Sequence, residues 1–172
     1  MEKTSTRWYL RHDEESVTVA ASAEAVYDLV AEMTRMGEWS PETARLEWID
    51  GSTGPAVGAR FVGHNISGPF HVLKWSRKGT VLAADRGREF SFATEEGGRE
   101  GTIWSYHFEP ADGGGTRVTE RYRVDSIPLW ARIVDVPTNR AKQLRDGMRH
   151  TLGQLKAAAE ANARDDAPSA RS

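Results

Sequence analysis

The chain has 172 residues, 38% hydrophobic and 28% charged, and its formal net charge is −2 at pH 7. This composition is typical of a globular domain and excludes a wholly disordered chain or a membrane-embedded one. The small net charge predicts no binding to nucleic acid. Because cysteine is absent, disulfides, thiolate metal ligands and a cysteine nucleophile are excluded.

The N-terminal residues carry no apolar run that would indicate a signal peptide. No stretch of the sequence approaches the roughly 20 apolar residues that a membrane helix needs. We therefore expect no stable membrane insertion and a cytoplasmic location.

The first forty residues predict a strand followed by two helical segments. Residues 16–21 are β-branched and alternating, which is typical of a strand. Ser22 is a good N-cap, and apolar residues recur at helical spacing over residues 25–33. Gly37 and the Trp-Ser-Pro sequence at 39–41 indicate a break into a second short helix or a turn.

The middle of the chain changes to the two-residue period of β-structure. Clusters of glycine, proline and aspartate separate the predicted strands. These strands span residues 44–50, 59–66, 70–84, 88–94, 102–109 and 116–126. The segment 70–84 is either one long strand or a bulged one.

The C-terminal part returns to helical spacing. Residues 127–136 predict a short helix, and Pro137 suits the start of the next one. A single apolar stripe then predicts a long amphipathic helix from Arg140 to about Asn162. This stripe consists of Leu144, Met148, Leu152, Leu155 and Ala159. The polar residues 163–172 are predicted to form a disordered tail.

Short connections between consecutive strands favour antiparallel pairing. The sheet needs one face covered, and the final helix carries the large apolar stripe that can cover it. The sequence therefore predicts an α+β fold in which a curved antiparallel sheet of about seven strands wraps around the long C-terminal helix. Two short helices follow the first strand. We expect one domain over residues 15–162, preceded by an N-terminal extension at 1–14.

Several stretches resemble the Bet v 1-like, START-related superfamily (SRPBCC), whose members are often labelled polyketide cyclase/dehydrase. The resemblance rests on residues 16–30, 36–41, 58–65, Trp75, Val81, 87–92 and 147–156. It implies a helix-grip fold in which the concave face of the sheet and the last helix enclose a cavity for hydrophobic or aromatic small molecules. It implies no particular activity, because the superfamily includes cyclases, lipid carriers and hormone receptors.

Alternation along the predicted strands indicates which side chains face the concave side of the sheet. Most of these side chains are aromatic, which suits a flat apolar ligand but is also typical of a filled core. The candidate ligand-binding residues are Trp48, Phe61, Asn65, Trp75, Arg77, Phe90, Phe92, Trp104, Tyr106, Glu120, Tyr122 and Met148.

The polar members of this set carry more information than the aromatic ones, because an unpaired buried charge is costly. Arg77 and Glu120 are predicted either to pair with each other or to hold a polar end of a ligand. A structural ion pair, or an Arg77 side chain that reaches solvent at the rim, is the alternative. Trp39 is either a gate residue or a plug of a small core.

Familiar catalytic and metal-binding patterns are absent from the sequence. It contains no Gly-x-Ser-x-Gly elbow and no phosphate-binding loop. His64 and His107 are predicted on the outer face, His150 on the exposed side of the last helix, and His12 on a solvated edge. We therefore expect no cofactor and no metal, and the sequence assigns no catalytic residue.

Three functions remain open. The first is a binder or carrier of a hydrophobic or aromatic small molecule, lipid- or polyketide-like, as a monomer or homodimer. The second is a polyketide cyclase or dehydratase in which Arg77, Glu120 and the two tyrosines polarise carbonyls or move protons. The third is an interaction or toxin-like regulatory protein with a filled cavity, for which Trp130 is a candidate surface residue.

Overall fold

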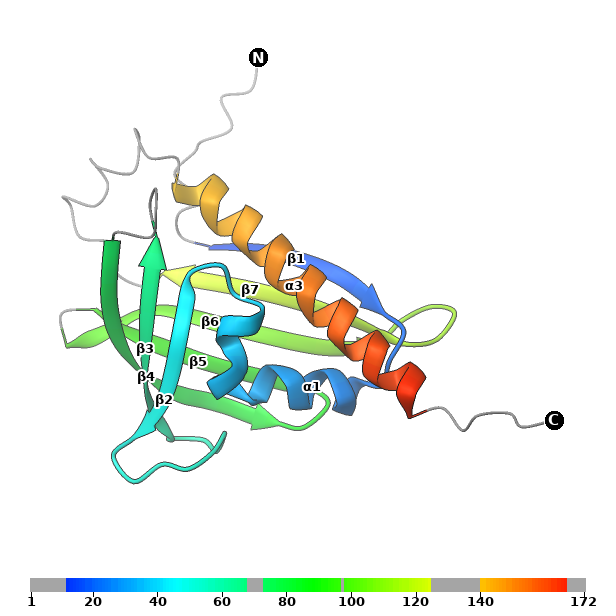
Figure 1. The fold of residues 1–172 in the computed structure, drawn as a ribbon, viewed down its shortest axis with the longest axis horizontal. Helices are drawn as coiled ribbons and strands as arrows, with labels where there is room; N and C mark the ends of the chain where they lie inside the picture. Colours follow the sequence, from blue (N-terminus) through cyan, green and yellow to red (C-terminus); the bar gives the residue numbers. More distant parts are fainter. Residues whose placement is uncertain (1–11, 68–72, 97, 125–139, 167–172) are drawn as a thin grey trace, which may run out of the picture.

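The structure, a computed structural model, describes residues 12–67, 73–96, 98–124 and 140–166. Figure 1 shows its elements in chain order. They are β1 (His12–Val19), α1 (Ala23–Ala31), the 3-10 helix η1 (Met33–Glu38), β2 (Thr43–Ile49), β3 (Arg60–Ser67), β4 (Leu73–Asp85), β5 (Glu89–Glu96), β6 (Arg99–Pro110), β7 (Thr116–Val124) and α3 (Arg140–Asp165).

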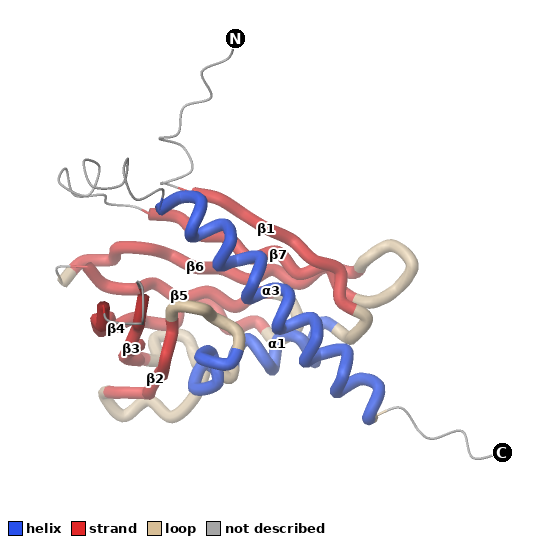
Figure 2. Tube along the Cα trace, turned by 45° about the horizontal axis from the view of Figure 1, so that its top comes forward, coloured by secondary structure: helices blue, strands red, loops and turns tan. Residues whose placement is uncertain are grey.

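The strands form one seven-stranded sheet in the order β1-β7-β6-β5-β4-β3-β2, and all neighbours are antiparallel. Helix α3 crosses the sheet over β1 and β7, while α1 contacts β5 and β6 and η1 contacts β2 (Figures 1 and 2). The α+β helix-grip fold is therefore confirmed. Among the described helices, none is long and apolar enough to cross a membrane.

The ends of the domain differ from the sequence prediction. Strand β1 begins at His12, so residues 12–14, predicted as part of an N-terminal extension, belong to the sheet. Helix α3 continues to Asp165, so residues 163–165, predicted as part of a disordered tail, are helical. Both extensions are rich in polar residues, and such segments give no hydrophobic period by which sequence reading could find them. The predicted helix at 127–136, Pro137 and Trp130 lie outside the described residues.

The start of α1 confirms the predicted cap. The Ser22 Oγ accepts a hydrogen bond of 3.2 Å from the backbone N–H of Ala25, which satisfies one of the free amides of the first turn. Val26, Leu29 and Val30 then bury their side chains in the core. The cap and the apolar stripe together explain why the helix begins and packs at this point.

Strand β4 is bulged, which was one of the two alternatives predicted from the sequence. The register with β5 shifts between Val81 and Ala83. Because the shift comes after Val81, the residues Trp75, Arg77 and Val81 keep one common face. Beyond the bulge Ala84, rather than Ala83, lies opposite Phe90.

The core lies between the concave face of the sheet and the helices. Tyr27 of α1 makes edge-to-face contacts with Phe90 and Phe108, at ring centroid distances of 5.9 and 5.7 Å. Phe61 and Phe92 meet in the same way at 5.5 Å. Each such pair adds about 0.5–1.5 kcal/mol beyond the burial of its area. This end of the concave face is therefore a packed aromatic core.

Candidate functional site

The candidate ligand-binding residues divide into a buried group and a half-buried group. The buried side chains are Phe61, Phe90, Phe92, Tyr106, Glu120, Tyr122 and Met148. The half-buried side chains are Trp48, Asn65, Trp75, Arg77 and Trp104. The register places all the strand residues of both groups on the concave face.

Burial changes along the concave face in one direction. On β6, Trp104 is half-buried whereas Tyr106 and Phe108 are buried. On β4, Trp75 is half-buried, and the strand becomes buried by Val81. Four of the half-buried residues, Asn65, Trp75, Arg77 and Trp104, lie toward the end of the sheet where α3 begins, whereas Trp48 lies opposite the buried Phe61. We call these four residues together the half-buried end of the concave face.

A buried acid lies next to this half-buried end. Glu120 of β7 is opposite Tyr106 of β6, and both side chains are nearly inaccessible, at 3% and 4% exposure. The Tyr106 hydroxyl donates a 2.8 Å hydrogen bond to Glu120 Oε1. Glu120 Oε2 is buried and, within the described part of the chain, has no hydrogen-bond partner.

Burial controls the protonation of this pair. Desolvation raises the pKa of the Glu120 carboxyl group to about 8, although the hydrogen bond from Tyr106 partly opposes this effect. Desolvation, followed by the nearby Glu120 charge, also raises the pKa of Tyr106 well above its ordinary value. Glu120 is therefore protonated in the folded protein at neutral pH.

Of the alternatives for Arg77 and Glu120, the ion pair between the two side chains is wrong. Glu120 bonds to Tyr106, and its second oxygen has no partner among the described residues. Strands β6 and β5 lie between β7 and β4, so roughly 14 Å of sheet separates the two backbones. The half-buried Arg77 lies instead opposite Gly63 of β3.

The next cross-strand pair along β6 and β7 is aromatic. Trp104 lies opposite Tyr122, with ring centroids 5.5 Å apart and planes tilted by 45°. Trp104 is half-buried and Tyr122 is 1% exposed, so this pair joins the half-buried end to the buried acid. A molecule resting against Trp104 would therefore lie one cross-strand pair from Glu120.

Other sequence-predicted residues have structural roles. Trp48 packs edge-to-face on Phe61 at 6.4 Å. Asn65 accepts a 3.4 Å hydrogen bond from the Thr43 hydroxyl. Trp39 is 4% exposed and part of the core, with the Arg35 guanidinium 5.1 Å above its ring, so its plug role is confirmed.

The histidine predictions are consistent with the register where it is described. His64 lies on the opposite face from Gly63, and its Nδ1 is 2.8 Å from the Ser76 hydroxyl. His107 follows the buried Tyr106 on β6 and therefore faces the other side, and His150 is exposed on α3. In the described segments, no three His, Asp or Glu side chains gather in a group that could hold a metal ion.

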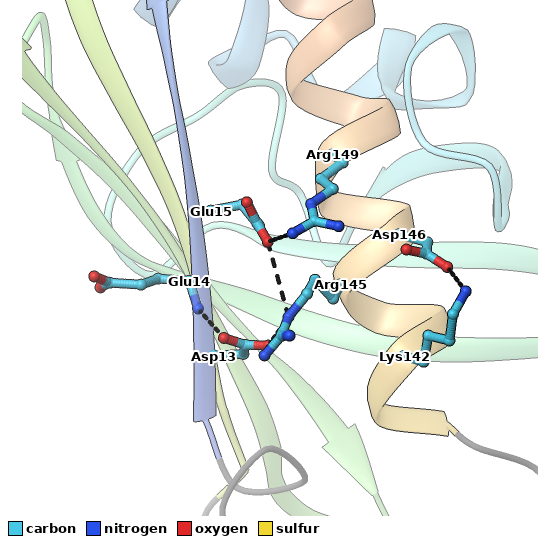
Figure 3. A network of polar contacts seen from close by, with 7 residues as sticks. All are labelled: Asp13, Glu14, Glu15, Lys142, Arg145, Asp146 and Arg149. Atoms are coloured by element: carbon cyan, nitrogen blue, oxygen red, sulfur yellow. Dashed lines mark hydrogen bonds and ion pairs between the residues drawn. The ribbon is translucent and has the colours of Figure 1, made fainter.

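A charged clasp between β1 and α3 was missed by the sequence analysis. Arg145 donates from Nε to Asp13 Oδ2 at 2.7 Å, and Arg149 pairs with Glu15 at 2.9 Å (Figure 3). Two signals could have found it: acids two residues apart share a strand face, and arginines four apart share a helix face. The clasp ties the first half of α3 to the sheet edge beside Tyr122, which lies opposite Asp13.

We expect the Asp13–Arg145 pair to stabilise the docking of α3. In a double-mutant cycle with Asp13→Asn and Arg145→Met, measured by urea unfolding, the coupling should be about 1–2 kcal/mol because both groups are partly buried and hydrogen-bonded. The exposed pair of Lys142 and Asp146 on the same helix is the control and should give about 0.3–0.5 kcal/mol. Equal coupling in the two pairs would contradict a specific role for the clasp.

The geometry defines a class of protein: a helix-grip α+β domain whose concave face is filled at one end and half-buried and aromatic at the other. The family described as "Polyketide cyclase / dehydrase and lipid transport" matches residues 12–160, and the chain belongs to this family. The match covers β1 through most of α3.

Solved structures share this fold. The polyketide-cyclase-like protein Cgl2372 from Corynebacterium glutamicum is 28% identical, with a TM-score of 0.60 over 91% of this chain and 96% of its own. The di-domain aromatase/cyclase StfQ of steffimycin biosynthesis is 17% identical, with a TM-score of 0.70 over 89% of this chain and 51% of its own. An AHSA1-like protein from Aeromonas hydrophila is 18% identical, with a TM-score of 0.58 over 88% of this chain and 94% of its own. No curated protein matches the chain.

Proposed function

We propose that the protein binds a hydrophobic or aromatic small molecule, lipid- or polyketide-like, at the half-buried end of its concave face and acts as a binder or carrier. The observation that carries the proposal is the contrast between the two ends of this face. One end is packed by Tyr27, Phe90 and Phe108, whereas Trp75 and Trp104 at the other end are only half-buried. Family membership supports the same chemistry.

Native mass spectrometry of freshly purified protein, followed by denaturing extraction, tests this proposal. The expected result is a co-purified apolar molecule, or saturable binding of an added probe such as 2-ethylnaphthalene by titration calorimetry. Neither a retained molecule nor probe binding would contradict the proposal and favour an interaction protein with a filled cavity.

We expect the substitutions Trp75→Ala and Trp104→Ala each to weaken binding of 2-ethylnaphthalene by about tenfold, because each removes a large aromatic contact surface. Calorimetric dissociation constants for the two variants and the unchanged protein check this. Val57→Ala is the control, because Val57 is a 68% exposed apolar side chain in the loop between β2 and β3. Unchanged affinity in both tryptophan variants would place the ligand elsewhere.

The second candidate function is a cyclase or dehydratase, and the buried Glu120–Tyr106 pair favours it. A protonated carboxyl group with a pKa of about 8 can exchange a proton near neutral pH. Together with the Tyr106 hydroxyl group, the Glu120 carboxyl group could polarise a ketone of the substrate and assist the loss of water. Incubation with a short synthetic poly-β-keto thioester distinguishes the two functions. A carrier leaves the thioester unchanged, whereas a cyclase converts it into a ring product. The substitution Glu120→Gln should then lower the yield of that product.

A further inference from the structure

Glu120 carries an unsatisfied polar atom in the buried part of the concave face. Its Oε1 accepts from the Tyr106 hydroxyl, while its Oε2 is buried with no partner among the described residues. A buried group without a partner costs about 1–3 kcal/mol, so this arrangement is unfavourable unless something else satisfies Oε2. A ligand that reaches past Trp104 is in position to do so, because Trp104–Tyr122 is the adjacent cross-strand pair.

The direction of the existing hydrogen bond determines what Oε2 offers. Because Tyr106 donates to Oε1, that oxygen acts as the carbonyl oxygen of a carboxylic acid. Oε2 then carries the proton and is a donor that lacks an acceptor. A carboxylate, by contrast, would place a full negative charge on a side chain that is only 3% exposed, beside the buried Tyr106 and Tyr122.

Among the residues that the structure describes, no cation pairs with Glu120 to compensate such a charge. On β6 and β7 its titratable neighbours are Tyr106 and Tyr122. Glu15 of β1 lies opposite Glu120, and its carboxylate pairs with Arg149 at the surface of α3. The second clasp arginine, Arg145, pairs with Asp13. Beyond the clasp arginines, the side chains of Met148, Thr151 and Leu152 on α3 are buried, and none of them carries a charge.

We propose that Glu120 is a recognition residue for carbonyl-bearing apolar ligands, and that its Oε2 donates a hydrogen bond to a ketone-type oxygen of the bound molecule. This inference rests on the proposed function and adds the chemical class of the ligand. The half-buried end would hold the apolar body of the ligand, and Glu120 would select a carbonyl oxygen at the inner end of the ligand. The preference for carbonyl-bearing ligands is lost as the pH rises through about 8, because deprotonation of Glu120 converts the hydrogen-bond donor into an anion that repels the carbonyl oxygen.

A matched pair of probes tests the inference: 2-acetylnaphthalene has a carbonyl where 2-ethylnaphthalene has a methylene group. At pH 6.5 the ketone should bind roughly three- to tenfold more tightly, the range of one added neutral hydrogen bond. At pH 9.5 the ratio of the affinities for the ketone and the hydrocarbon should fall to about one. The hydrocarbon cannot accept this hydrogen bond, so its binding controls for general effects of pH on the protein.

Two substitutions separate hydrogen bonding from shape. Glu120→Gln keeps an N–H donor beside an oxygen that accepts from Tyr106, so the ketone preference should persist and become independent of pH. Glu120→Met has a similar length without a donor, so the preference for the ketone over the hydrocarbon should disappear. In the infrared spectrum, the ketone stretch should shift to lower frequency with the unchanged protein and with Glu120→Gln, but not with Glu120→Met.

The outcomes distinguish the two proposals. Equal affinity for ketone and hydrocarbon at pH 6.5, or the same preference in Glu120→Met, overturns the carbonyl inference alone. Tighter binding of the cationic 1-(2-naphthyl)ethylamine than of the ketone also overturns it, since that result requires an ionised carboxylate. Failure of all three probes to bind overturns the proposed function and the inference together.

Discussion

Replacing Glu120 by Gln is expected to remove a loss of stability that the unchanged protein suffers as the pH rises from about 5 to 8. The pKa of this carboxyl group is about 8 in the folded state against an ordinary value of 4.5. Between these values the unfolded chain has released the proton and the folded protein has kept it. The free energy of unfolding therefore falls with pH, at up to about 1.4 kcal/mol per pH unit.

The sign follows from the raised pKa: stability is fully present below the unfolded value and is lost as the pH rises toward the folded one. Between pH 4.5 and 8 the total loss in the free energy of unfolding is about 5 kcal/mol. Urea unfolding of both proteins from pH 4.5 to 9 measures it. Glu120→Gln should be the more stable protein at pH 8.5, and its advantage should shrink toward pH 5.

Glu47→Gln provides the control for this experiment. Glu47 is an exposed carboxylate of β2 paired with Arg45, so its loss should leave the pH profile parallel to that of the unchanged protein. If Glu120→Gln also ran parallel to the unchanged protein, Glu120 would be ionised in the folded state at neutral pH. That result would remove the donor on which carbonyl recognition depends.

Replacing Gly79 by Ala is expected to lower the free energy of unfolding by about 2–4 kcal/mol, because the added methyl group has no room. A Cβ at this position would lie 2.3 Å from Phe61 Cζ and 2.5 Å from the carbonyl oxygen of Ala93. Phe61 lies opposite Gly79 across β3 and β4, and its ring occupies the space that the glycine leaves. The contact with a backbone oxygen means that a side-chain rotation alone cannot relieve the clash.

Gly63→Ala is the matched control, since Gly63 is also a buried glycine in a strand on the concave face. Its nearest outside atom, the carbonyl oxygen of Arg77, would be 3.9 Å from the new Cβ, an ordinary contact. We expect this change to be within about 1 kcal/mol of neutral, since alanine also reduces the freedom of the unfolded chain. Urea unfolding compares the two variants, and similar losses in both would show that the ring of Phe61 does not require Gly79.

The aromatic core shows why part of the candidate site could be predicted. The alternation of β6 is a local property of the chain, so it places Trp104, Tyr106 and Phe108 on one face without any knowledge of neighbouring strands. The same holds for Glu120 and Tyr122 on β7. For these strands, knowing the side-chain period was enough to know which residues share the concave face.

The partner of Glu120 could not be predicted in this way. Which residue lies opposite it depends on strand order and register, and these place Tyr106 on one side and Glu15 on the other. Arg77 is separated from it by two strands. A buried charge needs a partner, but within the described residues Glu120 instead has a raised pKa and a hydrogen bond from Tyr106.

By itself, the sequence determined the elements, the α+β class and the faces of the strands, because hydrophobic period and turn residues act over a few neighbouring positions. Only the tertiary structure decided that one end of the concave face is packed and the other half-buried, because that depends on where α1, η1 and α3 dock. It also decided the charged clasp of Asp13 with Arg145 and the pairing of Glu120 with Tyr106, which leaves Glu120 Oε2 without a partner among the described residues, since these contacts form only in the folded protein.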